Sequence, residues 1–134
     1  MENELLEKIK NWHDDGEHQN IIDAIKEIPE DQWDYDYVCY LARAYNNTNN
    51  AELAIPLFLS VKDEGENDQL WFFRIGYAYF YSGKYDLAAE SFEKAIIMDP
   101  EDDISKEFLS ECSYYINRAE NLIRPLFFSK CGFK

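Results

Sequence analysis

The sequence predicts an all-α protein built as a stack of helix-turn-helix hairpins with a C-terminal capping helix. The first observation is helical spacing, because apolar residues recur every three or four positions on both sides of a Ser-Gly-Lys step at residues 82–84. Pro100 ends this pattern. The second observation is repetition, because the same large or small character returns every 33 or 34 residues. Together they predict a repeated helical hairpin.

Four columns of residues share this period, and most members of a column are similar in size. The columns are Ile9, Ala42 and Gly76; Trp12, Tyr45 and Tyr79; Ile21, Ala54 and Ala88; and Ile25, Phe58 and Phe92. Small residues allow two helices to approach closely, and large rings fill the remaining space. Equivalent hairpins packed in the same way would require this pattern.

Helices are expected near residues 3–13, 18–27, 34–46, 51–62, 69–81, 86–97 and 103–124. Pro56 lies inside the fourth of these, where its missing amide predicts a bend. Pro125 is expected to end one long capping helix, although a turn at Asn117 would instead give a fourth helix pair over about 103–128. We therefore expect one domain over 1–124, with repeats at 2–34, 35–68 and 69–102, a capping helix at 103–124, and an apolar and basic tail at 125–134.

Residues 69–102 resemble the tetratricopeptide repeat family, whose pattern has an aromatic residue, Leu-Gly, Tyr, Ala, Phe, Ala and Pro. The matching residues are Phe72, Ile75, Gly76, Tyr79, Gly83, Tyr85, Ala88, Phe92, Ala95 and Pro100. Residues 35–68 follow the same pattern in part, and residues 2–34 keep its register. The resemblance implies a right-handed superhelix in which the first helix of each hairpin lines a concave groove that binds extended peptides.

By position, the resemblance places a peptide-binding site in this groove. The candidate site residues are Arg43, Asn46, Asn47, Phe73, Arg74, Tyr77, Tyr81 and Tyr114. Their arginine and asparagine side chains would hold a peptide backbone or a carboxylate, and the tyrosines would offer flat apolar contact. The alternative for Phe73 and Phe80 is that they pack against the capping helix.

The composition argues against several other classes of protein. A net charge of -14 repels phosphate backbones, so no nucleic-acid partner is expected. No apolar run approaches the roughly 20 residues of a membrane span, and the acidic N-terminus does not resemble a signal peptide, which favours a cytoplasmic location. The motif HDDGEH at residues 13–18 lacks the spacing of a metal site and is expected to form a polar turn between two helices. With no phosphate loop and no paired nucleophile and base, neither a cofactor nor an enzymatic activity is expected.

The sequence thus predicts a non-catalytic protein-protein interaction module that binds a peptide or partner helix in its concave groove. The acidic surface favours a partner with a basic segment. The alternative is a self-associating structural module, or the N-terminal scaffold of a larger protein. It rests on the apolar tail from Leu126 to Phe133, which could also join two copies as a homodimer.

Overall fold

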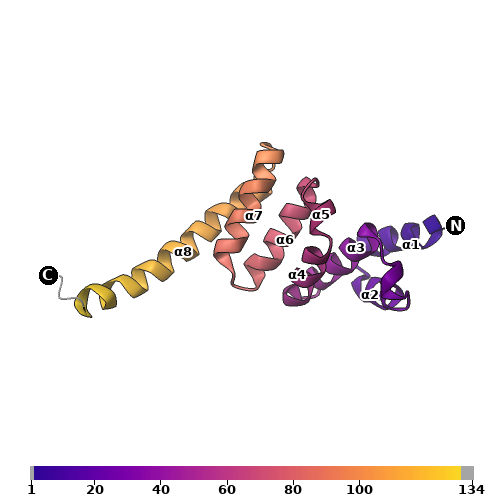
Figure 1. Ribbon diagram of the computed structural model, residues 1–134, viewed down its shortest axis with the longest axis horizontal. Coiled ribbons are helices and arrows are strands. Elements are labelled where there is room, and N and C mark those ends of the chain that lie inside the picture. Colours follow the sequence, from indigo (N-terminus) through magenta and orange to yellow (C-terminus); the bar gives the residue numbers. More distant parts are fainter. Residues whose placement is uncertain (1, 131–134) are drawn as a thin grey trace.

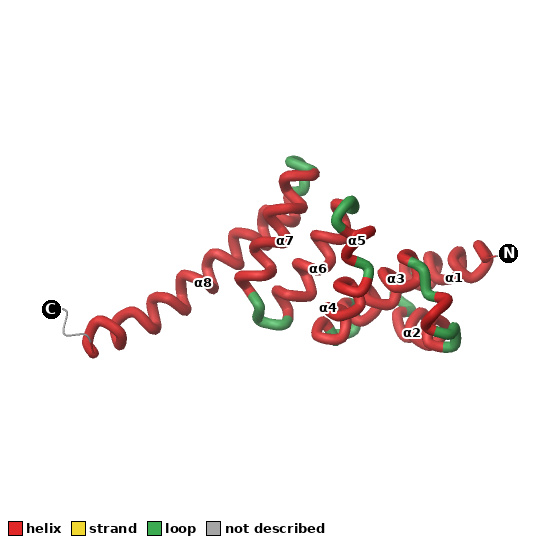
Figure 2. Tube along the Cα trace, viewed as in Figure 1, coloured by secondary structure: helices red, strands yellow, loops and turns green. Residues whose placement is uncertain are grey.

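The computed structural model describes residues 2–130, with side chains described over residues 4–122. Its helices form an elongated row from the N-terminus to the C-terminus (Figure 1). They are α1 (Glu2–Asp14), α2 (His18–Lys26), η1 (Glu30–Gln32), α3 (Tyr35–Asn46), α4 (Ala51–Ser60), α5 (Lys62–Gly65), α6 (Gln69–Tyr81), α7 (Tyr85–Met98) and α8 (Asp103–Lys130). Within residues 2–130 there is no strand (Figure 2), so the all-α prediction is confirmed.

Consecutive helices pack as hairpins. α1 packs on α2, α3 on α4, and α6 on α7, while α2 with α3, α4 with α6, and α7 with α8 join one hairpin to the next. All seven predicted helices are present, and five of them match within one residue at both ends. The short α5 and the 3-10 helix η1 were not expected from the sequence. The right-handed superhelical sense of the stack stays a prediction.

The repeating columns form the core. Its fully buried column residues include Ile21, Ala54, Ala88, Ile25, Phe58 and Phe92. A Cβ atom at Gly76 would lie 2.9 Å from Cε1 of Phe92. Because real Cβ atoms do not pack so closely, a residue larger than glycine would push α6 away from α7. The small residue in this column therefore sets the separation of the two helices.

The turn between the helices of each hairpin repeats the same left-handed backbone position. Gly16 has φ 76°, Asn49 has φ 63° and Gly83 has φ 75°, at spacings of 33 and 34 residues. Glycine adopts this region freely, and asparagine tolerates it better than most other residues. The period thus holds in the turns as well as in the core, and Asn49 is a member that the sequence reading missed.

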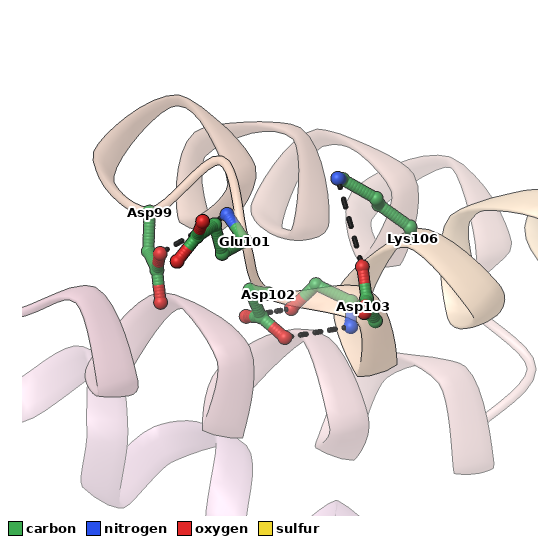
Figure 3. A network of polar contacts seen from close by, with 6 residues as sticks. Asp99, Glu101, Asp102, Asp103 and Lys106 are labelled. Atoms are coloured by element: carbon green, nitrogen blue, oxygen red, sulfur yellow. Dashed lines mark hydrogen bonds and ion pairs between the residues drawn. The ribbon is translucent and has the colours of Figure 1, made fainter.

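The second hairpin, the third hairpin and α8 each begin with an aspartate cap. The caps Asp34, Asp68 and Asp102 are spaced by 34 residues. Their carboxylates accept hydrogen bonds from the backbone amides of Tyr37 at 2.9 Å, Leu70 at 3.1 Å and Ser105 at 2.9 Å. Such caps satisfy amides that the first turn of a helix leaves free. Figure 3 shows Asp102 where α8 begins, next to Asp99 and Glu101 of the preceding turn.

The caps also connect neighbouring repeats. The residue after one cap donates a hydrogen bond to the next cap: the Tyr35 hydroxyl to Asp68 at 2.7 Å, and the Gln69 side-chain amide to Asp102 at 2.7 Å. Both contacts span 33 residues. α8 therefore starts with the same contacts as the first helix of a hairpin, although no described second helix follows it.

α8 continues as one helix to Lys130, so the predicted end at Pro125 is wrong. Proline lacks the amide that would bond the carbonyl four residues earlier, but its fixed φ is close to the helical value. The helix can therefore pass Pro125 at the cost of one hydrogen bond. The predicted homodimer depends on the tail from Leu126 to Phe133, whose side chains lie outside those that the structure describes. It therefore stays a prediction.

α4 ends at Ser60, two residues earlier than expected, and includes Pro56. The chain bends at Val61 before α5 begins. The Trp71 indole donates a 3.0 Å hydrogen bond to the carbonyl of Phe58, which a longer helix would have used itself. A contact from α6 therefore helps to end α4. The local sequence of residues 51–62 does not indicate this contact.

We expect Gly83→Ala to lower the free energy of unfolding by about 1–2 kcal/mol, because a Cβ atom is strained at a positive φ. Gly83→Asn should cost less, since asparagine already occupies the equivalent position at Asn49. Urea unfolding of both variants measures the difference. Equal losses for Ala and Asn would contradict the role of the left-handed turn.

A second prediction concerns Asp102. Partial burial acts to raise its pKa, but hydrogen bonds from Ser105 and Gln69 outweigh burial and hold that pKa below the ordinary value. A depressed carboxylate pKa contributes stability above the unfolded-state pKa of about 3.9, and this stability is lost as the pH falls through the folded-state pKa.

Asp102→Asn keeps a capping side chain but removes the titrating group. The stability advantage of the wild type over this variant should therefore be largest near neutral pH and shrink below about pH 4. Urea unfolding between about pH 7 and pH 3 measures it. A difference that is constant over this range would show that the charge of Asp102 contributes nothing.

Candidate functional site

Six of the eight predicted site residues line one cleft among α1, α3 and α6. Its lining consists of Arg43, Asn46, Asn47, Phe73, Arg74 and Tyr77, together with His13 and Leu70. The cleft encloses about 230 Å³. It lies where the last turn of α1 and the first helices of the second and third hairpins come together.

Tyr81 lies in a second cleft directly beside the first. This cleft of about 490 Å³ shares Asn46 and Tyr77 with the first, and it also includes Leu53 at the start of α4. The Tyr77 and Tyr81 ring centroids are 4.6 Å apart. The two clefts therefore adjoin across a pair of packed tyrosine rings.

Tyr114 lies apart from both clefts. It is an exposed residue of α8 whose ring centroid is 5.2 Å from that of Tyr115. The alternative for Phe73 and Phe80 is also visible: Phe80 is buried with its ring 5.2 Å from that of Phe108 in α8, and Phe73 is 6.2 Å from the same ring. Phe73 thus packs on the capping helix and lines the first cleft at once.

Arg43 of the first cleft contacts two rings, those of Tyr40 and His13. Its guanidinium lies 4.9 Å from the Tyr40 ring centroid, and its Nη2 is 2.9 Å from Nε2 of His13. Because an arginine only donates, His13 must accept through Nε2 and carry its proton on Nδ1. Burial, and then the positive charge of Arg43, lower the pKa of His13 below the ordinary value. The imidazole is therefore neutral at pH 7.

Arg74 brings a second cation into the same cleft. Burial lowers its pKa, and the charge of Arg43 lowers it further, but a guanidinium keeps its proton at any physiological pH. Among the side chains of residues 4–122, the ion pairs are Lys62 with Glu66 and Lys106 with Asp103, so neither cleft arginine has a carboxylate within 4.0 Å. The cleft is thus a positively charged point on a chain of net charge -14.

Asn46 adds an unused acceptor to the cleft. It is 8% exposed, and its Nδ2 donates a 3.2 Å hydrogen bond to the carbonyl of Arg74. Its Oδ1 is buried and accepts no hydrogen bond from the described residues. A buried acceptor without a donor costs about 1–3 kcal/mol. A ligand that donates a hydrogen bond here would remove that cost.

The family model described as tetratricopeptide repeat matches residues 71–102, which include nearly all of α6 and the whole of α7. The third hairpin of this chain therefore matches a tetratricopeptide repeat. A comparison with curated proteins gave no match. The tetratricopeptide repeat is in general a protein-protein interaction module and a non-catalytic fold, so the expected partners are proteins.

His13 is a cleft residue that the sequence reading missed, since it was assigned to a polar turn together with His18. The repeat register would have identified it, because His13 lies 33 positions before Asn46 and so shares its column. Within residues 2–130, no group of three His, Cys, Asp or Glu side chains is arranged to hold a metal ion. Over the same described residues, no helix is both long and apolar enough to span a membrane.

The His13–Arg43 contact predicts a measurable titration. In the wild type the imidazole of His13 should titrate below 6.5, because burial and the Arg43 charge disfavour its protonated form. Arg43→Gln should raise this midpoint, since it removes the charge and leaves an uncharged side chain. NMR of the imidazole carbons and nitrogens measures it. Arg118→Gln on α8 is the matched control, and an unchanged midpoint in Arg43→Gln would contradict the contact.

Proposed function

We propose that this tetratricopeptide repeat protein is a cytoplasmic, non-catalytic interaction module that binds an extended peptide in the groove formed by its two adjoining clefts. The observation that supports this most directly is the chemistry of the first cleft. Arg43 and Arg74 provide cations without a carboxylate partner among the described side chains, and Asn46 provides a buried acceptor without a donor.

The proposed ligand presents a carboxylate to the two guanidinium groups. Arginine binds a carboxylate through parallel hydrogen bonds, which are stronger than those between neutral groups. A backbone amide next to that carboxylate would donate to Oδ1 of Asn46. Asn47 is exposed at the C-terminal cap of α3, where its side chain can bond the peptide backbone. A peptide satisfies both requirements, whereas an isolated anion would leave Oδ1 of Asn46 unsatisfied.

The apolar part of the groove continues from this charged end. Phe73, Tyr77 and Tyr81 follow one another along α6, with Phe73 and Tyr77 ring centroids 6.4 Å apart. Tyrosine offers a large contact area with few rotatable bonds, so little entropy is lost when a ligand packs on it. We propose that an apolar side chain of the peptide lies on these rings. Tyr114 would contact only a peptide long enough to reach α8.

The charge around the groove suggests what flanks the carboxylate. Exposed acids lie at helix ends and turns, for example Asp14, Asp34 and Asp63. Such charges steer an oppositely charged partner and mainly change the association rate. The proposed peptide therefore has one acidic group for the cleft and basic residues on either side of it.

The test uses peptides selected from a random displayed library against the full chain. The selected peptides should contain Asp, Glu or a free C-terminus, and the double variant Arg43→Gln, Arg74→Gln should bind them at least tenfold more weakly. A tenfold loss is about 1.4 kcal/mol, which is less than one charged hydrogen bond contributes. Synthesis of each peptide with a free or amidated C-terminus distinguishes a terminal from a side-chain carboxylate.

The matched control is Lys62→Gln, Lys94→Gln, which removes two positive charges from a different hollow next to α7. It should bind like the wild type. Asn47→Ala should weaken binding and leave the melting temperature within a few degrees, because this side chain is exposed. Selected peptides without any carboxylate, or equal affinity in the arginine variant, would contradict the proposed function.

A further inference from the structure

The helix α8 has a helical neighbour along only part of its length. α3 and α6 each pack against the helix that follows them, whereas no described helix follows α8. α8 packs against α7, and its Phe108 and Tyr115 also contact rings of α6. α8 has 28 residues and α7 has 14. At 1.5 Å per residue these lengths are about 42 Å and 21 Å, so roughly half of α8 continues beyond α7. Figure 1 shows α8 projecting away from the rest of the stack.

A groove lies where α8 leaves α7. It encloses about 400 Å³ between the start of α7 and the middle of α8, and its apolar lining includes Leu87, Ile116 and Ala119. Beside them, the rings of Tyr85 and Tyr115 stack at 4.7 Å with an interplanar angle of 13°. The stacked pair gives this groove a rigid and flat wall.

The apolar surface continues along α8 from this groove. Tyr115, Ala119 and Leu122 are spaced by four and three residues, so they lie on one face of the helix. Tyr115 is 38% exposed, Leu122 is 67% exposed, and Ala119 between them is also exposed. A stripe with a small residue at its centre is suited to close contact with another helix.

Charge complementarity indicates what covers this stripe. Residues 118–134 contain Arg118, Arg124, Lys130 and Lys134 against Glu120 alone, a net charge of +3, and since the whole chain carries -14, residues 1–117 carry -17. On α7, the exposed acids Asp86, Glu90 and Glu93 are spaced by four and three residues and lie on one face. The described side chains offer them no ion pair.

We propose that a second copy of this chain covers the stripe. The two α8 helices would cross in antiparallel orientation about a two-fold axis near Ala119. In that arrangement the basic end of each α8 is directed toward the α7 helix of the other copy, which carries Asp86, Glu90 and Glu93. The interface is isologous, because each copy gives one basic end and receives one. It uses a surface separate from the proposed peptide groove.

Sedimentation equilibrium of the full chain over about 1–500 μM tests this. A dimer is expected, and Ala119→Arg should raise its dissociation constant at least tenfold by placing a large cation at the crossing point. Ser110→Arg is the matched control, because it is exposed on α8 nine residues away and thus on the opposite face. Raising the salt concentration from about 0.05 to 0.5 M should also weaken the dimer, since it screens the charges.

Cross-linking locates the contact. The cross-linking uses a Cys131→Ser background, in which the remaining native cysteines Cys39 and Cys112 are buried and should not react. There, Ala119→Cys should form a disulfide-linked dimer under mild oxidation. Ser110→Cys should not, because it lies on the opposite face of α8. Circular dichroism confirms that each variant is folded. A strict monomer would overturn the proposal and leave the groove to a helix of another protein, and a dimer that Ala119→Arg leaves intact would also overturn it. The Arg43→Gln, Arg74→Gln variant should still dimerise, which separates this test from that of the peptide groove.

Discussion

The close approach of α6 and α7 at Gly76 is the constraint on which the rest of this structure depends. The Phe92 ring occupies the space that a Cβ atom at Gly76 would need. A larger residue at position 76 would force the two helices apart or displace the ring. The smallest residue of the repeat thus sets how closely α6, which carries Phe73, Arg74 and Tyr77 of the first cleft, packs on α7.

The aspartate caps extend this constraint from one hairpin to the next. Asp68 accepts hydrogen bonds from its own helix and from Tyr35 of the preceding repeat, and Asp102 does the same with Ser105 and Gln69. One aspartate therefore caps the first turn of its own helix and also links that helix to the preceding repeat. Arg43 and Arg74 face the same cleft because their helices are held in this register. Two nearby cations are unfavourable alone, which suits a site that binds an anion.

Much of the candidate site followed from repeat position. The period placed Arg43, Asn46 and Arg74 on first helices, and these residues do line one cleft. His13 was missed because its neighbours resemble a polar turn, although its column is that of Asn46. Tyr114 was assigned by analogy of position, but it is exposed on α8 and lines neither cleft. Position in a repeat identifies a shared face only while successive helices keep the same packing.

The sequence by itself determined the helices, the turn at residues 82–84 and the buried columns. These depend on spacing within one or two helical turns and on a period that is visible in the chain. Only the tertiary structure decided the end of α4 at the Trp71 indole, the protonated nitrogen of His13, and the unsatisfied Oδ1 of Asn46. Each of these depends on the distance between atoms of different helices. Local pattern contains no information on that distance until the helices are packed.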